Sequence, residues 1–402
     1  MLDATVEIRL QAMTPPLVHG VARLASLLYA GSSFGDLLDL IGPEPSPDLV
    51  GNGVHAAWLM DRSWAFSLNF SPYQAAHLQQ AALSRQLVFQ IRSASAEAGS
   101  LRLLALAAPG DLMVNAPLDF LTEPTGVRLE IAYLGPSLQL PACLPDHDVA
   151  IVAASESAPD TLAVFARWFG AWPRPILNDP AGILPLSRPR LPHFIAGRPG
   201  LLTAPCCEIS REELADSPAP FPFPFLLRPL GSHAGHGLVR IDTAQDLASL
   251  LAASDDALFT LTGFIDYRSA DGWYRKYRIA FVDGQPFVCH MAASDHWMVH
   301  YLNAGMDTDP AKRRDEAMAM AGFDRFARRH AAGLDGIAAA IGLDYFSVDC
   351  AEAPDGRLLV FEVDTAAIIH SMDDPVLYPY KRATMQRCYD AFGTMLRGRC
   401  RR

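Results

Sequence analysis

The sequence lacks the features of exported and membrane proteins. Its longest apolar runs fall far short of the roughly 20 residues that a membrane-spanning helix needs. The N-terminal stretch, residues 1–7, has neither the basic start nor the apolar core of a signal peptide. We therefore expect a cytoplasmic protein with no membrane anchor.

The patterns of several binding classes are also missing. A formal net charge of −11 argues against general nucleic-acid binding, which needs a basic surface. The seven cysteines show no metal-ligand spacing, and the neighbours Cys206 and Cys207 are not expected to form a disulfide, so we expect free thiols. No internal repeat or low-complexity segment is evident. Half of the 402 residues are hydrophobic, which is typical of a globular chain of two or three domains.

A carboxylate-rich hairpin is the most informative segment that is present. We expect one strand to end at Asp349, a turn at Pro354–Gly356, and a second strand over 357–364. Because strand side chains alternate between faces, Glu362 and Asp364 should point the same way, with Asp349 within reach. Three such carboxylates predict a site for Mg²⁺ or Mn²⁺, which prefer oxygen ligands. The alternative is a hairpin with solvated acids on its outer face.

A second informative segment is a glycine-rich loop between two strands. Residues 225–228 and 238–241 have strand patterns, and the loop between them contains Gly231, Ser232, Gly235 and Gly237. Glycines allow sharp turns and let backbone amides approach a ligand, so this loop beside Arg228 is expected to bind phosphate. No helix follows the loop at once, which excludes a Walker loop and a dinucleotide fingerprint.

These segments together resemble the ATP-grasp superfamily of ligases. The matching segments occur in the family's order over residues 100–390: Arg228–Gly237, Thr262–Ile265, Tyr277–Gly284, Gly342–Asp349 and Val360–Asp364. The phrases at 264–268, 297–301 and 378–382 resemble bacterial ATP-grasp domains found beside tetratricopeptide repeats, although this chain shows no such repeat.

The resemblance implies the positions of the nucleotide and of the metal. The implied ATP-binding residues are Arg188, Arg228, Gly231, Ser232, Gly235, Gly237, Thr262, Gly263, Phe264, Ile265 and Phe361. The backbone of 262–265 would bind adenine, which would stack on Phe361. Asp349, Glu362 and Asp364 would hold Mg²⁺, and Arg278 would stabilise the transferred phosphoryl group.

Two positions depart from the family pattern. Arg228 stands where the family usually has lysine, and the chain is poor in lysine and rich in arginine. Either side chain is cationic, although arginine offers a fork and lysine a point charge. Asp364 stands where asparagine is usual, and the extra negative charge should strengthen divalent cation binding.

The expected fold class is α/β of the ATP-grasp type. We expect a mainly helical region over 1–98 and a small α/β domain over 99–185. In that small domain, strands at 101–110, 127–134 and 148–153 form a parallel sheet. A lid subdomain should follow over 186–260, and a larger subdomain with a C-terminal helix over 261–402.

The function implied by the resemblance is an ADP-forming ligase that joins a carboxylate to an amine through an acyl phosphate. Amino acids or peptides are the implied substrates, and a homo-oligomer is left open. Two alternatives remain: a phosphotransferase of the same fold, and an ATP-binding regulatory protein whose site has lost activity. Loop residues His233 and His236 are expected to be exposed, with donation to phosphate as the alternative. His290, His296, His300 and His370 are expected to flank the site without binding a transition metal.

Overall fold

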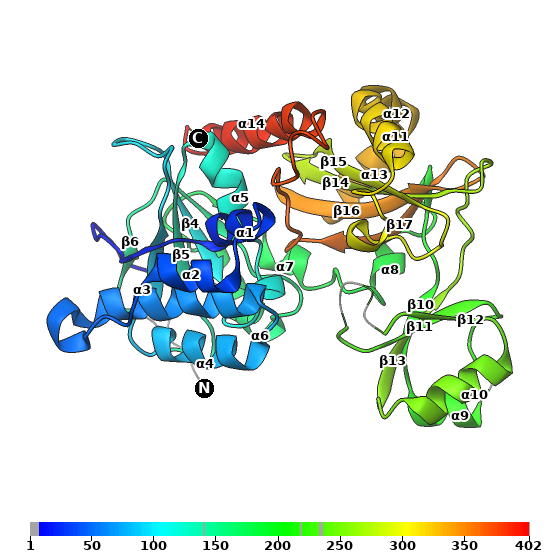
Figure 1. The fold of residues 1–402 in the computed structure, drawn as a ribbon, viewed down its shortest axis with the longest axis horizontal. Coiled ribbons are helices and arrows are strands. Elements are labelled where there is room, and N and C mark those ends of the chain that lie inside the picture. The colour runs from blue at the N-terminus through cyan, green and yellow to red at the C-terminus, as the bar shows by residue number, and fades with distance from the viewer. Residues whose placement is uncertain (1–7, 140, 218, 233–234, 236, 402) are drawn as a thin grey trace.

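The fold was analysed in a computed structural model that describes residues 8–139, 141–217, 219–232, 235 and 237–401. An N-terminal half lies on one side of the molecule, and two further sheets lie on the other (Figure 1). The segments Met1–Glu7, His233 and His236, which carried sequence-based expectations, lie outside the described residues. Within the described part, no helix has the length and apolarity to cross a bilayer.

The N-terminal half is built on a six-stranded sheet in the order β2–β3–β5–β4–β7–β8. The strands are β2 (Leu17–Val18), β3 (Val88–Ile91), β4 (Arg102–Ala107), β5 (Arg128–Tyr133), β7 (Val149–Val152) and β8 (Ile176–Leu177). The three strands predicted from the apolar runs are confirmed as the parallel neighbours β5, β4 and β7. Strand β3 runs antiparallel to β5, which makes the sheet mixed. Strands β1 (Leu10–Gln11) and β6 (Leu144–Pro145) form a separate parallel pair.

Helices surround this sheet. They are α1 (Val21–Tyr29), α2 (Phe34–Ile41), α3 (Pro47–Leu68), α4 (Pro72–Leu83), α5 (Asp119–Thr122), α6 (Pro159–Phe169) and α7 (Pro180–Ile183). Helix α8 (Leu191–Ile195) follows in the sequence but lies beside the five-stranded sheet described below (Figure 1). The expected helical character of the first 98 residues agrees with α1–α4. However, β2 and β3 from this region join the sheet of the following one. The sheet thus crosses the expected boundary near residue 98, and the four-part division of the chain stays a prediction.

A four-stranded antiparallel sheet, which we call the lid sheet, has the strand order β10–β13–β11–β12. It comprises β10 (Cys206–Ser210), β11 (Phe225–Pro229), β12 (Val239–Ile241) and β13 (Leu258–Gly263), with α9 (Arg211–Asp216) and α10 (Ala244–Ala253) packed against it. The predicted strand, glycine loop and returning strand are confirmed as β11 and β12, which pair in antiparallel register.

A five-stranded sheet in the order β15–β14–β16–β17–β9 forms the larger part. Its strands are β9 (Leu201–Leu202), β14 (Tyr274–Val282), β15 (Gln285–Ser294), β16 (Tyr345–Glu352) and β17 (Leu358–Asp364). One face is covered by α11 (Pro310–Ala321), α12 (Phe323–Arg329) and α13 (Ala331–Ile341). The predicted carboxylate hairpin is confirmed as β16 and β17, but its first strand continues past Asp349 to Glu352, because Asp349 is paired on a central strand.

The two halves are joined by the C-terminal helix α14 (Lys381–Arg399), which spans the top of the molecule (Figure 1). Its buried residues Cys388 and Phe392 share one core with the six-stranded sheet and with Ala280 of β14. Asn178 provides a second link, because its side-chain amide exchanges hydrogen bonds of 2.7 and 2.9 Å with the backbone of Tyr345 on β16. All seven cysteines are free thiols, as expected.

Candidate active site

A row of polar side chains crosses one face of the five-stranded sheet. On neighbouring strands His290 pairs with Arg278, and Arg278 pairs with Asp349. Asp349 in turn pairs with Glu362. Directly opposed residues of antiparallel strands share a face, so these four form what we call the polar row. Register shifts lie beside Arg278 and Asp349. Such bulges re-aim side chains and occur often near active sites.

The centre of the polar row is a buried ion pair. Arg278 Nε and one terminal nitrogen donate to the two Asp349 oxygens at 2.8 and 3.0 Å. Lys276 Nζ lies 2.6 Å from Asp349 Oδ2, and the Asp349 side chain is only 2% exposed. Although burial acts the other way, Arg278 and Lys276 hold the pKa of Asp349 well below its usual range. Asp349 therefore stays ionised and positions both cations on this face.

At the outer end of the polar row, Glu362 lies with the cation Arg188 and with one further acid, Asp364. Arg188, in the segment before α8, donates to Glu362 Oε2. Asp364 lies two residues beyond Glu362 on β17, and its Oδ1 accepts the amide of Ala366 at 2.7 Å. Burial and the negative charge of Glu362 raise the pKa of Asp364 to about 6. The structure thus brings the three hairpin carboxylates to one face together with Arg188, which the sequence placed there only through a loose match.

Glu156 is an acid of this site that the sequence analysis did not identify. It follows β7 in the N-terminal half, about 200 residues before the hairpin. One carboxylate oxygen, Oε2, is buried without a hydrogen-bond partner among the described residues. Burial, followed by the charge of Asp364, raises the pKa of Glu156 to about 7. Its position at the carboxyl end of a parallel strand, where ligands of α/β sheets usually bind, was the available signal.

We expect Glu156→Gln to stabilise the fold at pH 8 and to change little at pH 4. The folded-state pKa near 7 exceeds the ordinary value of 4.5. The contribution of Glu156 to stability is therefore fully present below about pH 4.5 and is lost as the pH rises through 7. The expected gain at pH 8 is about 1–3 kcal/mol in the free energy of unfolding. Urea titrations at both pH values measure it, with exposed Glu97→Gln as the control. Equal effects of Glu156→Gln at both pH values would contradict it.

Arg228 faces the same site from the lid sheet. Its Nε donates to Ser232 Oγ at 3.0 Å, and a terminal nitrogen donates to the Ser232 carbonyl. Burial and the positive charge of Arg188 lower the pKa of Arg228 to about 10. Two cations whose charges act on each other in this way favour an anion at this position.

The glycine loop requires its glycines. Gly231, Gly235 and Gly237 have positive φ angles of 74°, 75° and 64°, which favour residues without a side chain. At Gly237 an added Cβ would lie 2.7 Å from Pro229 Cδ. The conformation of the loop therefore depends on these glycines. The hydrogen bonds from Arg228 of β11 to Ser232 hold the start of the loop against that strand.

The segment predicted to bind adenine lies where the lid sheet ends. Thr262 and Gly263 complete β13, and the amide of Gly263 donates to the Pro205 carbonyl at 2.9 Å. The amide of Phe264 donates to the Pro224 carbonyl at 3.4 Å. Both amides are thus engaged within the protein. Ile265 and Phe361 share one partly buried apolar cluster.

The carboxylates fit a magnesium ion only in part. Among the described residues, no three His, Cys, Asp or Glu side chains form a ready metal site. Asp349 is occupied by Arg278 and Lys276, whereas the raised pKa of Asp364 beside Glu362 shows crowded negative charge that a cation would relieve. Magnesium in nucleotide sites commonly uses one or two carboxylates together with phosphates and water. Glu362 and Asp364 fit this pattern, and Asp349 fits it less well than predicted.

Three histidines surround Arg278. His290 belongs to the polar row, and the charges of Arg278 and other cations act on both His300 and His370. Burial is the largest cause that lowers the pKa of each of the three. They are therefore neutral at pH 7.

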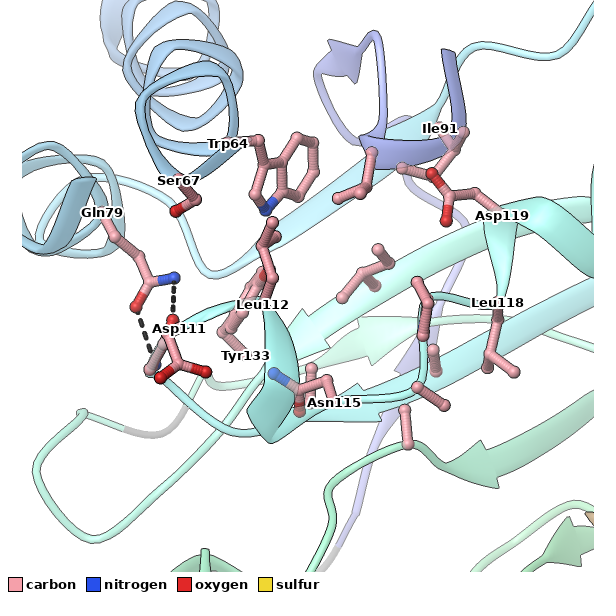
Figure 2. Close-up of a pocket in the computed structure, with 18 residues that line it drawn as sticks. Trp64, Ser67, Gln79, Ile91, Asp111, Leu112, Asn115, Leu118, Asp119 and Tyr133 are labelled. Atoms are coloured by element: carbon pink, nitrogen blue, oxygen red, sulfur yellow. Dashed lines mark hydrogen bonds between the residues drawn. The ribbon is translucent and has the colours of Figure 1, made fainter. Parts of the chain in front are cut away.

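A separate small cavity of about 50 Å³ lies between the N-terminal helices and the six-stranded sheet (Figure 2). Gln79 exchanges two hydrogen bonds of 2.8 Å with the backbone of Gly110. Asn115 does the same with Ala108, at 2.7 and 2.8 Å. Asp119 accepts the amide of Ala22 at 2.6 Å at the start of α1. Because these polar groups already have partners, we assign no ligand to this cavity.

In comparisons with known proteins, the chain matches only solved structures. No family model and no curated protein sequence matches the chain. D-alanine–D-alanine ligase from Bacillus anthracis complexed with ATP is 14% identical and covers 75% of this chain and 97% of its own, with a TM-score of 0.43. The ATP-grasp ligase PsnB complexed with a minimal precursor, Mg and ADP is 13% identical, with coverages of 73% and 98% and a TM-score of 0.43. A RimK domain ATP-grasp protein from Sphaerobacter thermophilus is 16% identical, with coverages of 74% and 99% and a TM-score of 0.41. These TM-scores lie below 0.5, so the function is argued from the site itself.

Proposed function

We propose that this protein is an ATP-dependent ligase of the ATP-grasp type that joins a carboxylate to an amine. The observation that carries the proposal is the polar row with its flanking cations. Lys276, Arg278 and Arg188 surround three acids on one face of the sheet, and Arg228 faces them from the lid sheet. Phosphoryl transfer needs mainly positioning and neutralisation of charge, which this arrangement supplies without a protein nucleophile.

In this proposal, ATP lies between the lid sheet and the five-stranded sheet. Its phosphates would contact Arg228, Arg188 and the amides of the glycine loop at Gly231, Ser232, Gly235 and Gly237. Adenine would lie against Phe361 and Ile265, which share an apolar cluster. The backbone of 262–265 would contact its edge.

Glu362 and Asp364 are the proposed ligands of Mg²⁺, with Mn²⁺ as a substitute. Asp349 is the third proposed ligand, and it would bind the ion once Arg278 and Lys276 contact the phosphates of ATP in place of Asp349. When bound, the ion neutralises phosphate charge. The protein's own contribution is to hold these acids in line on one face. The extra charge of Asp364, compared with an asparagine, is consistent with this role.

The proposed chemistry has two steps. A substrate carboxylate oxygen attacks the γ-phosphorus of ATP, the bond to the β-phosphate oxygen breaks, and an acyl phosphate and ADP form. An amine then attacks the acyl carbon, loses a proton, and expels phosphate to leave an amide. Arg278 stabilises the charge that develops on the transferred group and on the tetrahedral oxygen. Amino acids or peptides are the proposed substrates, and the cytoplasm is the proposed location. A homo-oligomer stays a prediction.

The decisive experiment is a screen of ADP release over mixtures of carboxylates and amines, with mass spectrometry of the products. The proposal expects ADP, free phosphate and an amide only when both substrates are present. ADP with a phosphorylated hydroxyl acceptor and no free phosphate would instead identify a phosphotransferase. ATP binding without turnover in any mixture would indicate a regulatory protein.

We expect Arg228→Ala to weaken ATP binding by about 10- to 100-fold, because a hydrogen bond to a charged group contributes about 1.5–3 kcal/mol. Adenosine binding should change less than threefold or so, since only the phosphates lose their partner. Calorimetric titration with both ligands measures the difference. Arg167→Ala, at an exposed position of α6 in the N-terminal half, is the control. Equal losses for ATP and adenosine would make Arg228 a structural residue that supports the loop through Ser232.

A further inference from the structure

A cluster of five polar side chains, two buried and three half-buried, lies beyond the His290 end of the polar row. Glu316 of α11 is fully buried, and Lys381 at the start of α14 is 3% exposed. Lys381 Nζ lies 3.4 Å from Glu316 Oε1 and 3.2 Å from Asp373 Oδ1. Tyr301 and Tyr380 complete the set, and their hydroxyls donate to Glu316 Oε2 at 3.0 and 2.7 Å. We call these five residues the Lys381 cluster.

The Lys381 cluster is fully connected. Lys381 Nζ also donates to the Tyr301 hydroxyl and lies 4.1 Å from the centre of its ring. Glu316 Oε1 accepts the amide of Met291 at 3.2 Å. Burial raises the pKa of Glu316, while Lys381 and the tyrosine hydroxyls oppose the rise. A buried polar network in which each member has partners is rigid and fixes one arrangement of the elements that carry it.

Two contacts connect this cluster to the proposed reaction centre. The ring of Tyr301 lies 4.8 Å from the ring of His290, which pairs across the sheet with Arg278. Asp373 belongs to the segment 365–380 that leads from Asp364 to α14. The same segment carries His370, on which the charge of Arg278 acts. Lys381 thus joins the segment after the proposed metal ligands to the strand β15 that carries His290.

The N-terminal half contacts the same segment. The rings of Tyr29 at the end of α1 and Phe120 of α5 lie 5.6 and 6.1 Å from the ring of His370. His370 is therefore held from two sides, by these rings and by the anchor at Asp373. The segment 365–373 has little freedom beside Arg278 while Lys381 is in place.

We propose that Lys381 is a positioning residue for the reaction, which holds segment 365–373 and His290 in place around Arg278. The inference rests on the proposed function. Lys381 touches neither nucleotide nor the reacting groups in this proposal. It acts through Asp373 on one side and through Tyr301 and Glu316 on the other. Its loss should therefore leave ATP binding intact and slow the chemical step, because misplacement of reacting groups by about 1 Å can cost about 100-fold in rate.

The test compares full-length variants. Lys381→Met alone leaves Glu316 buried without its cation and is expected to unfold in part. The double variant Lys381→Met/Glu316→Gln removes both charges and keeps side-chain size. Arg382→Met is the matched control, since Arg382 is the exposed neighbour of Lys381 on α14. Three quantities are measured: affinity for a non-hydrolysable ATP analogue, ATP turnover at saturating substrates, and amide hydrogen exchange in 365–373.

In the double variant we expect nucleotide affinity within about twofold of wild type, turnover lower by about 10- to 100-fold, and faster exchange in 365–373. Arg382→Met should match wild type in all three. Unchanged turnover, or unchanged exchange in 365–373, would overturn the inference, as would a loss of nucleotide affinity as large as the loss of turnover. A wild-type protein that binds no nucleotide would refute the proposed function, on which the inference rests.

Discussion

Replacement of Arg278 by methionine is expected to lower ATP turnover by about 100- to 1000-fold, because the charge that develops during phosphoryl transfer loses its partner. The same change should destabilise the fold by about 3 kcal/mol, since Asp349 is buried and would keep only Lys276 as a partner. Affinity for ATP should change little, because the ground-state phosphates keep Arg228 and Arg188. Steady-state kinetics, calorimetry and urea unfolding measure the three effects.

Two further variants separate the role of Arg278 in chemistry from its role in folding. Arg278→Lys should restore most of the stability but only part of the turnover, since a point charge cannot replace a bidentate fork. Arg275→Met is the matched control on the same strand. Arg275 pairs with Asp271 and Asp315 at 2.6 Å each, on the opposite face of β14. If Arg278→Met and Arg275→Met had the same turnover, the assignment of Arg278 would be wrong.

Replacement of Glu362 by glutamine is expected to reduce turnover by at least about 100-fold at saturating Mg²⁺, because neutralising metal and phosphate charge contributes several kcal/mol. The variant also removes the ionic partner of Arg188. ATP affinity should fall more in the presence of Mg²⁺ than in its absence. Calorimetric titration with and without the ion measures this difference, and its readout does not depend on turnover.

Glu352→Gln is the control for the Glu362 variant, because Glu352 lies on the same hairpin. Its carboxylate pairs with Arg329 at 2.6 Å and is 38% exposed, so a small effect is expected. Turnover of Glu362→Gln equal to that of Glu352→Gln would remove Glu362 from the proposed metal site. An equal loss of ATP affinity with and without Mg²⁺ would mean that the substitution acts only by removing the ionic partner of Arg188.

Much of the fold could be predicted because its signals are local. The strands β4, β5 and β7 are short apolar runs between turn residues, and the hairpin turn at Pro354–Gly356 follows from turn chemistry. The order of strand, glycine loop and strand around Arg228 is also a local pattern. What local patterns missed was that β2 and β3 pair with strands of the next region, since such pairing depends on contacts far apart in sequence.

The candidate site was predicted less completely. The alternation of side chains placed Glu362 and Asp364 on one face, and the register of β16 and β17 agrees. The sequence left open that Arg278 pairs with an acid across the sheet. Alternation within a strand says nothing about the side chain opposite, so it did not identify Asp349 as that acid or Lys276 as its second partner. That pairing is why Asp349 fits a metal ion less well than expected.

The sequence by itself determined the strands, the glycine loop and the carboxylates of the hairpin, because period-two alternation and turn residues act over a few positions. Only the tertiary structure decided which charges meet. The charge of Asp364 acts on Glu156 from the other half of the chain, and Lys381 joins α11, α14 and the segment after Asp364. The physical reason is that strand register and the packing of helices on a sheet are set by the whole core. The charges at its edge are brought together as a consequence.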